Sequence, residues 1–306
     1  MRLFFAPIQG YTDHLYRSLH QTLIGGVDVY FTPFVRWDNG CIRNKDLRDI
    51  MPENNVGVVT IPQVICANGD ELAHLLDTLQ TLGYSQVDVN MGCPFPLQTG
   101  RGRGAALLAN EEALESVVHE MERRPEVVFS VKMRSGLNSI DEGLRSLCRL
   151  NEVALQWVTI HPRLGRQQYK GTPDMESFAQ MATACCHPVV YNGDIRSTKQ
   201  IDELCKAYPT LHGIMMGRGL LGRPTLAWEW QQRQTLSNSE VVQRSMEIHR
   251  QLYDQACRSL QGDQQILGRM RAFWEYQQPL IDKKVYKRLM KAGSCRRYEE
   301  AVLMVH

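Results

Sequence analysis

Short runs of aliphatic and β-branched residues recur at intervals of a few tens of residues along most of this chain, and stretches with helical spacing separate them. Such alternation is typical of βαβ units, in which successive strands lie parallel. Eight of these runs occur, at residues 3–6, 27–32, 61–66, 87–90, 127–133, 156–161, 188–191 and 213–216. Eight strands with intervening helices make a (β/α)8 TIM barrel, an α/β fold whose active site lies at the carboxyl ends of the strands. We therefore predict that fold.

A small basic helical region is predicted after the barrel. Residues 235–240 form a polar break with helix-capping residues, and three stretches of helical spacing follow at 241–260, 264–280 and 283–291. We therefore place a barrel domain at residues 1–235 and an all-helical domain at residues 236–306. From residue 241 onward the chain has 12 Lys and Arg against 7 Asp and Glu, a net charge of +5, whereas the whole chain carries +2.

Seven cations of this helical region fall within 15 residues that contain no acid. They are Lys283, Lys284, Lys287, Arg288, Lys291, Arg296 and Arg297. Clustered cations with tyrosines beside them are typical of a nucleic-acid-binding surface. The alternative is an ordinary solvated helix face. The aromatic residues Phe273, Trp274 and Tyr276 have helical spacing, and we expect them to form the core of the region rather than a base-stacking platform.

Composition narrows the class of protein. Hydrophobic residues at 43% and charged residues at 22% are ordinary for a soluble globular protein. No apolar run approaches the roughly 20 residues of a membrane span, and the apolar stretch at the N-terminus is too short for a signal peptide. Nine cysteines without zinc-type spacing fit a reducing compartment and no metal site. We expect a cytoplasmic protein that is monomeric by default.

Polar residues and glycines lie at or just beyond nearly every predicted strand end, so they should converge on one mouth of the barrel. They are Arg36, Gln63, Asn90, Cys93, Lys132, Arg134, His161, Asn192, Gly193, Asp194, Gly217 and Arg218. The glycines after the last two strands predict a phosphate site built from backbone N–H groups, with ordinary tight turns as the alternative. Gln63 and His161 are candidates for ring contacts, or else are structural residues.

Two of these residues point to specific chemistry. Lys132 lies inside the apolar run 127–133, where a buried ammonium needs an anion or an electron-rich ring, such as a reduced flavin, unless it points outward. Cys93 lies in a turn between Gly92 and Pro94 that would hold its thiol at the barrel mouth. That thiol could be a nucleophile, a metal ligand, a proton donor or an inert buried group. No second cysteine at ligand spacing supports a metal.

Taken together, these motifs resemble the dihydrouridine synthase family over nearly the whole chain. The matching segments are residues 6–10, 90–94, 104–108, 131–134, 160–163 with 169–171, 191–195 and 216–219. The resemblance implies FMN at the barrel mouth, reduced by NADPH, with hydride passing to C6 of a flipped-out tRNA uridine and Cys93 protonating C5. A free-pyrimidine dehydrogenase and a barrel that binds RNA without catalysis are the alternatives.

The resemblance also assigns roles to single residues. It places Pro7, Ile8, Gln9, Gln63, Lys132, His161, Asn192, Gly193, Asp194, Gly217 and Arg218 around the flavin. It places Arg36, Asn90, Arg134, Arg163 and Tyr169 near the nucleotide. The segment 34–36 is similar to that of the subfamily that modifies position 16 of the D-loop. Where the family usually has lysines after the Cys-Pro pair, this chain has the uncharged residues 95–98, and a flexible cationic loop at 99–104 follows.

Overall fold

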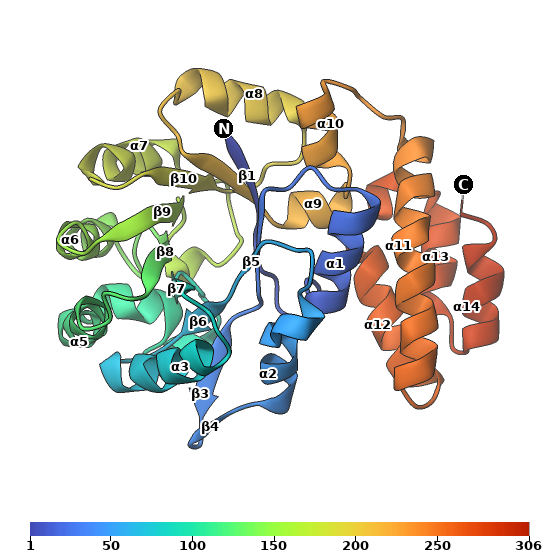
Figure 1. Ribbon diagram of the computed structural model, residues 1–306. Helices are drawn as coiled ribbons and strands as arrows, with labels where there is room; N and C mark the ends of the chain where they lie inside the picture. The colour runs from blue at the N-terminus through green and yellow to red at the C-terminus, as the bar shows by residue number, and fades with distance from the viewer. Residues whose placement is uncertain (306) are drawn as a thin grey trace.

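Parallel strands surrounded by helices form the body of the computed structural model, which describes residues 1–305, and further helices flank it on one side (Figure 1). The strands are β1 (Arg2–Phe5), β2 (Val29–Phe31), β3 (Val35–Asp38), β4 (Cys41–Ile42), β5 (Thr60–Ile61), β6 (Gln63–Ile65), β7 (Gln86–Met91), β8 (Val128–Arg134), β9 (Leu155–His161), β10 (Val189–Asn192) and β11 (Gly213–Met216). Their order in the sheet is β4-β3-β6-β7-β8-β9-β10-β11-β1-β2-β5.

The sheet closes on itself through one interrupted strand. Pro62 has no N–H group to donate, and it separates β5 from β6. β5 pairs with β2, whereas β6 pairs with β3 and β7, so the two halves of this strand join both ends of the sheet. The predicted barrel fold is therefore confirmed, and the predicted strand at 61–66 is divided in two.

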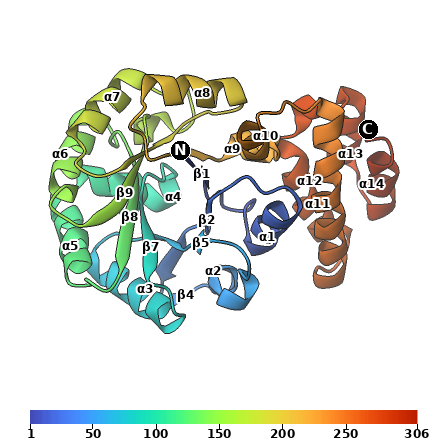
Figure 2. The ribbon, with the colours of Figure 1, turned by 45° about the horizontal axis from the view of Figure 1, so that its top comes forward.

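Helices cover the outside of the barrel and continue beyond it (Figure 2). The helices of the barrel are α1 (His14–Leu23), α2 (Asn44–Ile50), α3 (Gly69–Thr81), α4 (Pro96–Thr99), α5 (Glu111–Glu122), α6 (Ile140–Leu150), α7 (Met175–Ala184), α8 (Thr198–Ala207), α9 (Arg218–Gly222) and α10 (Leu226–Gln232). Those that follow are α11 (Asn238–Ser259), α12 (Asp263–Glu275), α13 (Lys283–Lys291) and α14 (Cys295–Val302). Short 3-10 turns lie at Pro52–Asn54, Gly104–Ala109, Gly165–Gln167 and Gln278–Leu280.

A hairpin between β2 and β5 was not predicted. β3 and β4 pair antiparallel, and Asn39 and Gly40, with φ of 52° and 81°, connect them. Two positive φ values suit the tight turns that favour Asn-Gly between antiparallel strands, so this dipeptide marked the hairpin in the sequence. Arg36 lies on this hairpin.

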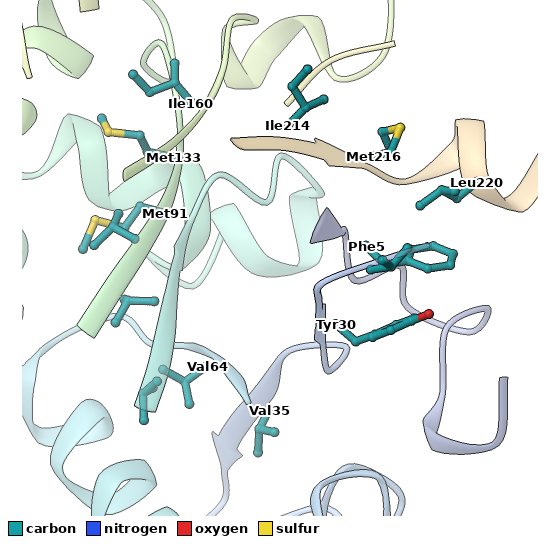
Figure 3. Packing of buried hydrophobic residues seen from close by; sticks show 14 of the residues in the cluster. Phe5, Tyr30, Val35, Val64, Met91, Met133, Ile160, Ile214, Met216 and Leu220 are labelled. Carbon is teal, nitrogen blue, oxygen red and sulfur yellow. The ribbon is translucent and has the colours of Figure 1, made fainter. Parts of the chain in front are cut away.

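Two apolar layers stabilise the barrel. Outward-facing side chains of the strands pack against the helices, and Figure 3 shows part of this layer, with Phe5, Val64 and Met133 among the labelled residues. Inward-facing side chains form a second cluster inside the barrel, made of Phe4, Ala6, Val29, Phe31, Ile61, Trp157, Val190 and Met215. On β9 and β10 these inner apolar residues precede the polar His161 and Asn192, so the polar groups lie toward the carboxyl ends.

The helices after residue 237 share the hydrophobic core of the barrel. Ile248, Leu267 and Trp274 belong to the same buried cluster as the outer face of the sheet. Phe273 and Trp274 are buried, as expected of a helical core, whereas Tyr276 is only half-buried. The predicted third helix, 283–291, is confirmed, whereas the second ends at Glu275 instead of 280, and α14 was not predicted. The division into two domains at residue 235 stays a prediction. Within residues 1–305 no helix has the length and apolar character to cross a membrane.

Candidate active site

A cavity of about 340 Å³ opens at the carboxyl ends of the barrel strands, within the range of about 300–1,000 Å³ that small-molecule sites occupy. A narrower cavity of about 80 Å³ adjoins it and shares Lys132, His161 and Tyr169 with it. All the predicted site residues except Arg36 and Arg163 line one or both. These are Pro7, Ile8, Gln9, Gln63, Asn90, Cys93, Lys132, Arg134, His161, Tyr169, Asn192, Gly193, Asp194, Gly217 and Arg218.

Cys93 is fixed by hydrogen bonds on both sides. Its backbone N–H donates to Asn90 Oδ1 at 2.8 Å, and its carbonyl accepts from Ala105 N at 3.0 Å. Gly104 makes this contact possible, since a Cβ there would lie 2.7 Å from the Cys93 carbonyl oxygen, and its φ is 63°. Cys93 as a whole residue is only 7% exposed. The Cys93 turn therefore has little freedom to move.

Electrostatics keep the Cys93 thiol protonated at neutral pH. Burial raises the pKa of Cys93, and the backbone of Phe95 and the charges of Lys132 and Arg134 offset this effect only in part. A nucleophilic cysteine would need a lowered pKa, whereas a proton donor needs its proton. Of the roles left open by the sequence, the environment favours the proton donor.

Lys132 points into the barrel, where it lines both cavities. Burial and then the charge of Arg134 lower the pKa of Lys132 to about 8, although Asp88 and Cys93 favour its charged form. No salt bridge within residues 1–305 engages it. An anionic or electron-rich ligand in the cavity would supply the missing partner.

His161 is neutral and has a defined tautomer. Burial and the surrounding charges, that of Lys132 first, lower the pKa of His161 well below its ordinary value. Its Nε2 lies 3.2 Å from Arg163 Nη1, and a guanidinium can only donate, so Nε2 accepts and Nδ1 carries the proton. Arg163 does not line the cavity, but it orients a residue that does.

Two arginines and one acid are paired beside Tyr169, and of these Asp194 and Arg218 line the narrow cavity. Arg163 and Arg218 both pair with Asp194 at 2.5 Å, and the Arg218 guanidinium lies 4.4 Å from the centre of the Tyr169 ring. Arg134 donates to two backbone carbonyls, while its buried Nε has no hydrogen-bond partner within residues 1–305. This Nε is sealed from the cavity, so Arg134 would reach a ligand through the part of its side chain that lines the wider cavity.

The narrow cavity is built from glycines and backbone. A Cβ on Gly219 would lie 1.8 Å from the Ile195 carbonyl oxygen, and one on Gly193 would lie 2.8 Å from the Tyr191 hydroxyl. Glycine at these positions therefore lets the segments around the narrow cavity pack closely against neighbouring protein atoms. The first N–H groups of α9 have no intrahelical partner, and Arg196 and Arg218 add positive charge. These features fit an anionic group such as a phosphate.

The loop at 99–104 differs from its predicted flexible, exposed form. Arg103 has only 4% of its side chain exposed, and it pairs with Glu71 at 2.8 Å and with Asp38 at 2.7 Å. Arg101 and Arg36 pair with the same Asp38. Burial works to raise the pKa of Asp38, but the hydrogen bond from Arg103 and the three arginine charges outweigh it and hold the pKa below its ordinary value. Arg103 is therefore committed to structure, whereas Arg101 pairs with Asp38 from an exposed position.

We expect Arg103→Leu to lower the free energy of unfolding by about 3–5 kcal/mol, since it leaves the partly buried Glu71 without its cation. Denaturant unfolding would measure the change. Arg101→Leu is the matched control, because Arg101 pairs with the same Asp38 but is 64% exposed, and it should cost less than about 1 kcal/mol. Equal losses in the two variants would contradict a structural role specific to Arg103.

Several cavity residues were not predicted from the sequence. The wider cavity is also lined by four aromatic residues, Tyr11, Phe34, Phe95 and Tyr276. Tyr276 comes from the end of α12 in the helical region. The Tyr11 and Tyr276 rings lie 5.2 Å apart and join that region to the barrel mouth. Asp88, fully buried on β7, hydrogen-bonds to the cavity residue Gln63. Within residues 1–305 no group of three or more His, Cys, Asp or Glu is placed to hold a metal.

Residues 4–305 match the protein family described as Dihydrouridine synthase (Dus). The tRNA-dihydrouridine(16) synthase of Pseudomonas putida is 28% identical over 74% of this chain and 72% of that protein. The tRNA-dihydrouridine synthase B of Pseudomonas aeruginosa is 28% identical over 73% of this chain and 67% of that protein. Morphinone reductase, at 11% identity, has a similar fold, with a TM-score of 0.51 over 77% of this chain and 86% of that chain. Because the family match runs through almost the whole chain, this chain belongs to the dihydrouridine synthase family.

Proposed function

We propose that this protein reduces the C5–C6 bond of a uridine in the D-loop of tRNA to 5,6-dihydrouridine, with FMN as its flavin and NADPH as the reductant. Membership of the dihydrouridine synthase family makes uridine reduction the reaction class. The observation that carries the proposal is a buried, protonated thiol, Cys93, held in one cavity with the cations Lys132 and Arg134. Relatives named for position 16 make that position the first to test. We further propose a monomer in the cytoplasm.

The two cavities fit a flavin mononucleotide. The glycine-lined narrow cavity suits the phosphate, with Gly193, Gly217 and Arg218 as its contacts. Lys132 and His161 line both cavities and would contact the ring system, where Lys132 would stabilise negative charge. When bound and reduced, the flavin supplies the hydride that adds to C6 of uracil.

Protein side chains would supply the proton for C5 and bind the base. Cys93 would donate its Sγ proton to C5, and the charges of Lys132 and Arg134 would stabilise the thiolate left behind until solvent reprotonates it. Asn90 and Arg134 line the wider cavity and would hydrogen-bond the polar edge of the base. A base reaches such a cavity only after leaving its stack, and Tyr169 at the wall offers an aromatic surface for it.

The reaction and its position are tested together by quantitative nucleoside mass spectrometry. The sample is tRNA from cells with and without the gene, digested into fragments that separate D-loop positions. Loss of dihydrouridine at one position in the deletion strain, restored by the intact gene, is the expected result. Unchanged dihydrouridine, in a host with no overlapping enzyme, would remove tRNA as the substrate.

Ionisation of Lys132 should make binding of the reduced cofactor depend on pH. Its pKa of about 8 means that the ammonium is charged below pH 8 and loses its charge as the pH rises further. We expect the affinity of the protein for anionic reduced FMN, measured anaerobically by fluorescence titration, to fall above pH 8. Lys132→Arg stays charged and should remove this decline. A decline that persists in Lys132→Arg would assign it to another group.

A further inference from the structure

The barrel interior holds a carboxylate that the proposed reaction does not use. Asp88 is fully buried on β7, and the strand register places it between Gln63 on β6 and Ser130 on β8. Asp88 Oδ1 accepts from Ser130 Oγ at 2.6 Å, and Asp88 Oδ2 accepts from Gln63 Nε2 at 2.7 Å. Both carboxylate oxygens therefore have partners, and neither oxygen belongs to a cavity wall.

These hydrogen bonds have a fixed direction. Burial raises the pKa of Asp88 to about 6, so the carboxylate is mostly ionised at neutral pH. An ionised carboxylate can only accept, so at neutral pH Gln63 must turn its Nε2 toward Asp88. The Gln63 Oε1 atom then faces Asn90 and accepts from its Nδ2 at 2.7 Å. This leaves Asn90 Oδ1 to accept from the backbone N–H groups of Gly92 at 3.0 Å and Cys93 at 2.8 Å.

The direction matters because either amide can turn over. If Asn90 were reversed, its Nδ2 would face the two N–H donors of the Cys93 turn, and three donors would meet without an acceptor. A buried unsatisfied donor destabilises its surroundings, so the turn would move. The chain is fixed at both ends, by the backbone N–H groups of Gly92 and Cys93, which can only donate, and by Asp88, which accepts and so keeps the Gln63 oxygen turned toward Asn90.

We propose that Asp88 is a positioning residue that sets the orientation of the Gln63 and Asn90 amides and thereby holds the Cys93 turn in place. Asp88 reaches Cys93 through two side chains and touches neither substrate nor cofactor. The importance of this placement for catalysis rests on the proposed role of Cys93 as proton donor. The placement itself is a property of the folded chain.

A competing explanation is that Asp88 acts by its negative charge on Lys132. The two explanations differ for Asp88→Asn. The side-chain amide of this variant keeps an oxygen that accepts from Gln63. Its Nδ2 can donate to the Ser130 hydroxyl, which changes from donor to acceptor in this hydrogen bond because a hydroxyl can do both. Asp88→Asn thus preserves the direction of the Gln63 and Asn90 hydrogen bonds and removes the negative charge. Adding Ser130→Ala removes the acceptor for that Nδ2, and Asp88→Leu removes both the charge and the acceptor.

The experiment measures the rate at which iodoacetamide alkylates Cys93 in the purified flavin-containing protein, resolved by peptide mass spectrometry. The variants are D88N, S130A, D88N/S130A and D88L. We expect iodoacetamide to alkylate Cys93 in D88N at close to the rate in the unaltered protein. In S130A the rate should change less than in the double variant, because Asp88 loses one donor but still accepts from Gln63. The double variant and D88L should change that rate by about tenfold or more, the scale of one unsatisfied buried group. Dihydrouridine formation should fall in the same two variants.

Cys66 is the internal control for folding. Its thiol is fully buried at the end of β6 and lies outside the hydrogen-bonded chain. It should stay unreactive in every variant that folds. If D88L makes Cys66 reactive, D88N/S130A decides the test.

Two results would overturn the proposal. In one, D88N changes Cys93 alkylation as much as D88N/S130A, which would assign the effect to charge. In the other, the double variant and D88L both match the unaltered protein. Alkylation needs no RNA. If the protein formed no dihydrouridine, the proposed function would be contradicted, but the alkylation rates would still test the role of Asp88.

Discussion

Replacing Cys93 by alanine is expected to lower the rate of dihydrouridine formation by about 10²–10⁴-fold, the contribution typical of a positioned general acid. The thiol lines the cavity with Lys132 and Arg134, and burial keeps its pKa above the ordinary value, so it enters the reaction carrying a proton. Single-turnover reduction of a tRNA transcript by the pre-reduced enzyme would measure the loss, because this assay excludes steps that involve NADPH.

Cys66→Ala is the matched control for this experiment. Both thiols are buried, but Cys66 does not line the cavity, so its loss should leave the rate within about threefold of the unaltered protein, unlike loss of a general acid. RNA affinity and flavin absorbance should be unchanged in both variants. A full rate in Cys93→Ala would show that the proton comes from water or from another group, and the proposed role of Cys93 would have to be abandoned.

Strand-end residues were predictable from the sequence because the barrel fold fixes where they meet. Once eight parallel strands are inferred, residues such as His161 and Asn192 must lie at one end. The cavity confirms that convergence. The flavin and nucleotide roles of single residues came from the family resemblance and stay predictions.

Asp88 could not have been singled out by the same argument. It lies inside a strand with the pattern Val87-Asp88-Val89, where both faces of the sheet are covered. A lone acid there gives no indication of its partners, which come from strands 25 and 42 residues away in the chain. The sequence likewise could not show that Arg103 is held by Asp38 and Glu71, since that pairing depends on the unpredicted hairpin.

The helical region contributes to the cavity as well as to the proposed RNA surface. Its Tyr276 lines the cavity and packs against Tyr11, whereas the cations of α13 lie on the surface. Lys283, Lys287 and Lys291 are four residues apart and so share one face of that helix. No salt bridge within residues 1–305 engages them, so their charges are available to phosphates.

Replacing Lys283, Lys284, Lys287 and Lys291 together by glutamine should weaken tRNA binding by about 10²–10³-fold at 0.15 M salt, if each contacts a phosphate. The slope of the logarithm of affinity against the logarithm of salt concentration should fall by about one per lysine removed. Fluorescence anisotropy with labelled tRNA over a series of salt concentrations gives both quantities. Single-turnover reduction at saturating tRNA should be preserved, because the cavity is untouched.

The double variant Lys199→Gln/Lys206→Gln is the control, since these lysines lie on α8, on the barrel rather than on the helical region (Figure 1). It removes surface charge without touching the proposed RNA surface, so the salt slope should stay unchanged. If the α13 variant kept the full slope, its cations would be an ordinary solvated face. The tRNA would then have to be held by the barrel mouth, where Arg101 and Arg103 are already paired with acids and could bind phosphate only by giving up those partners.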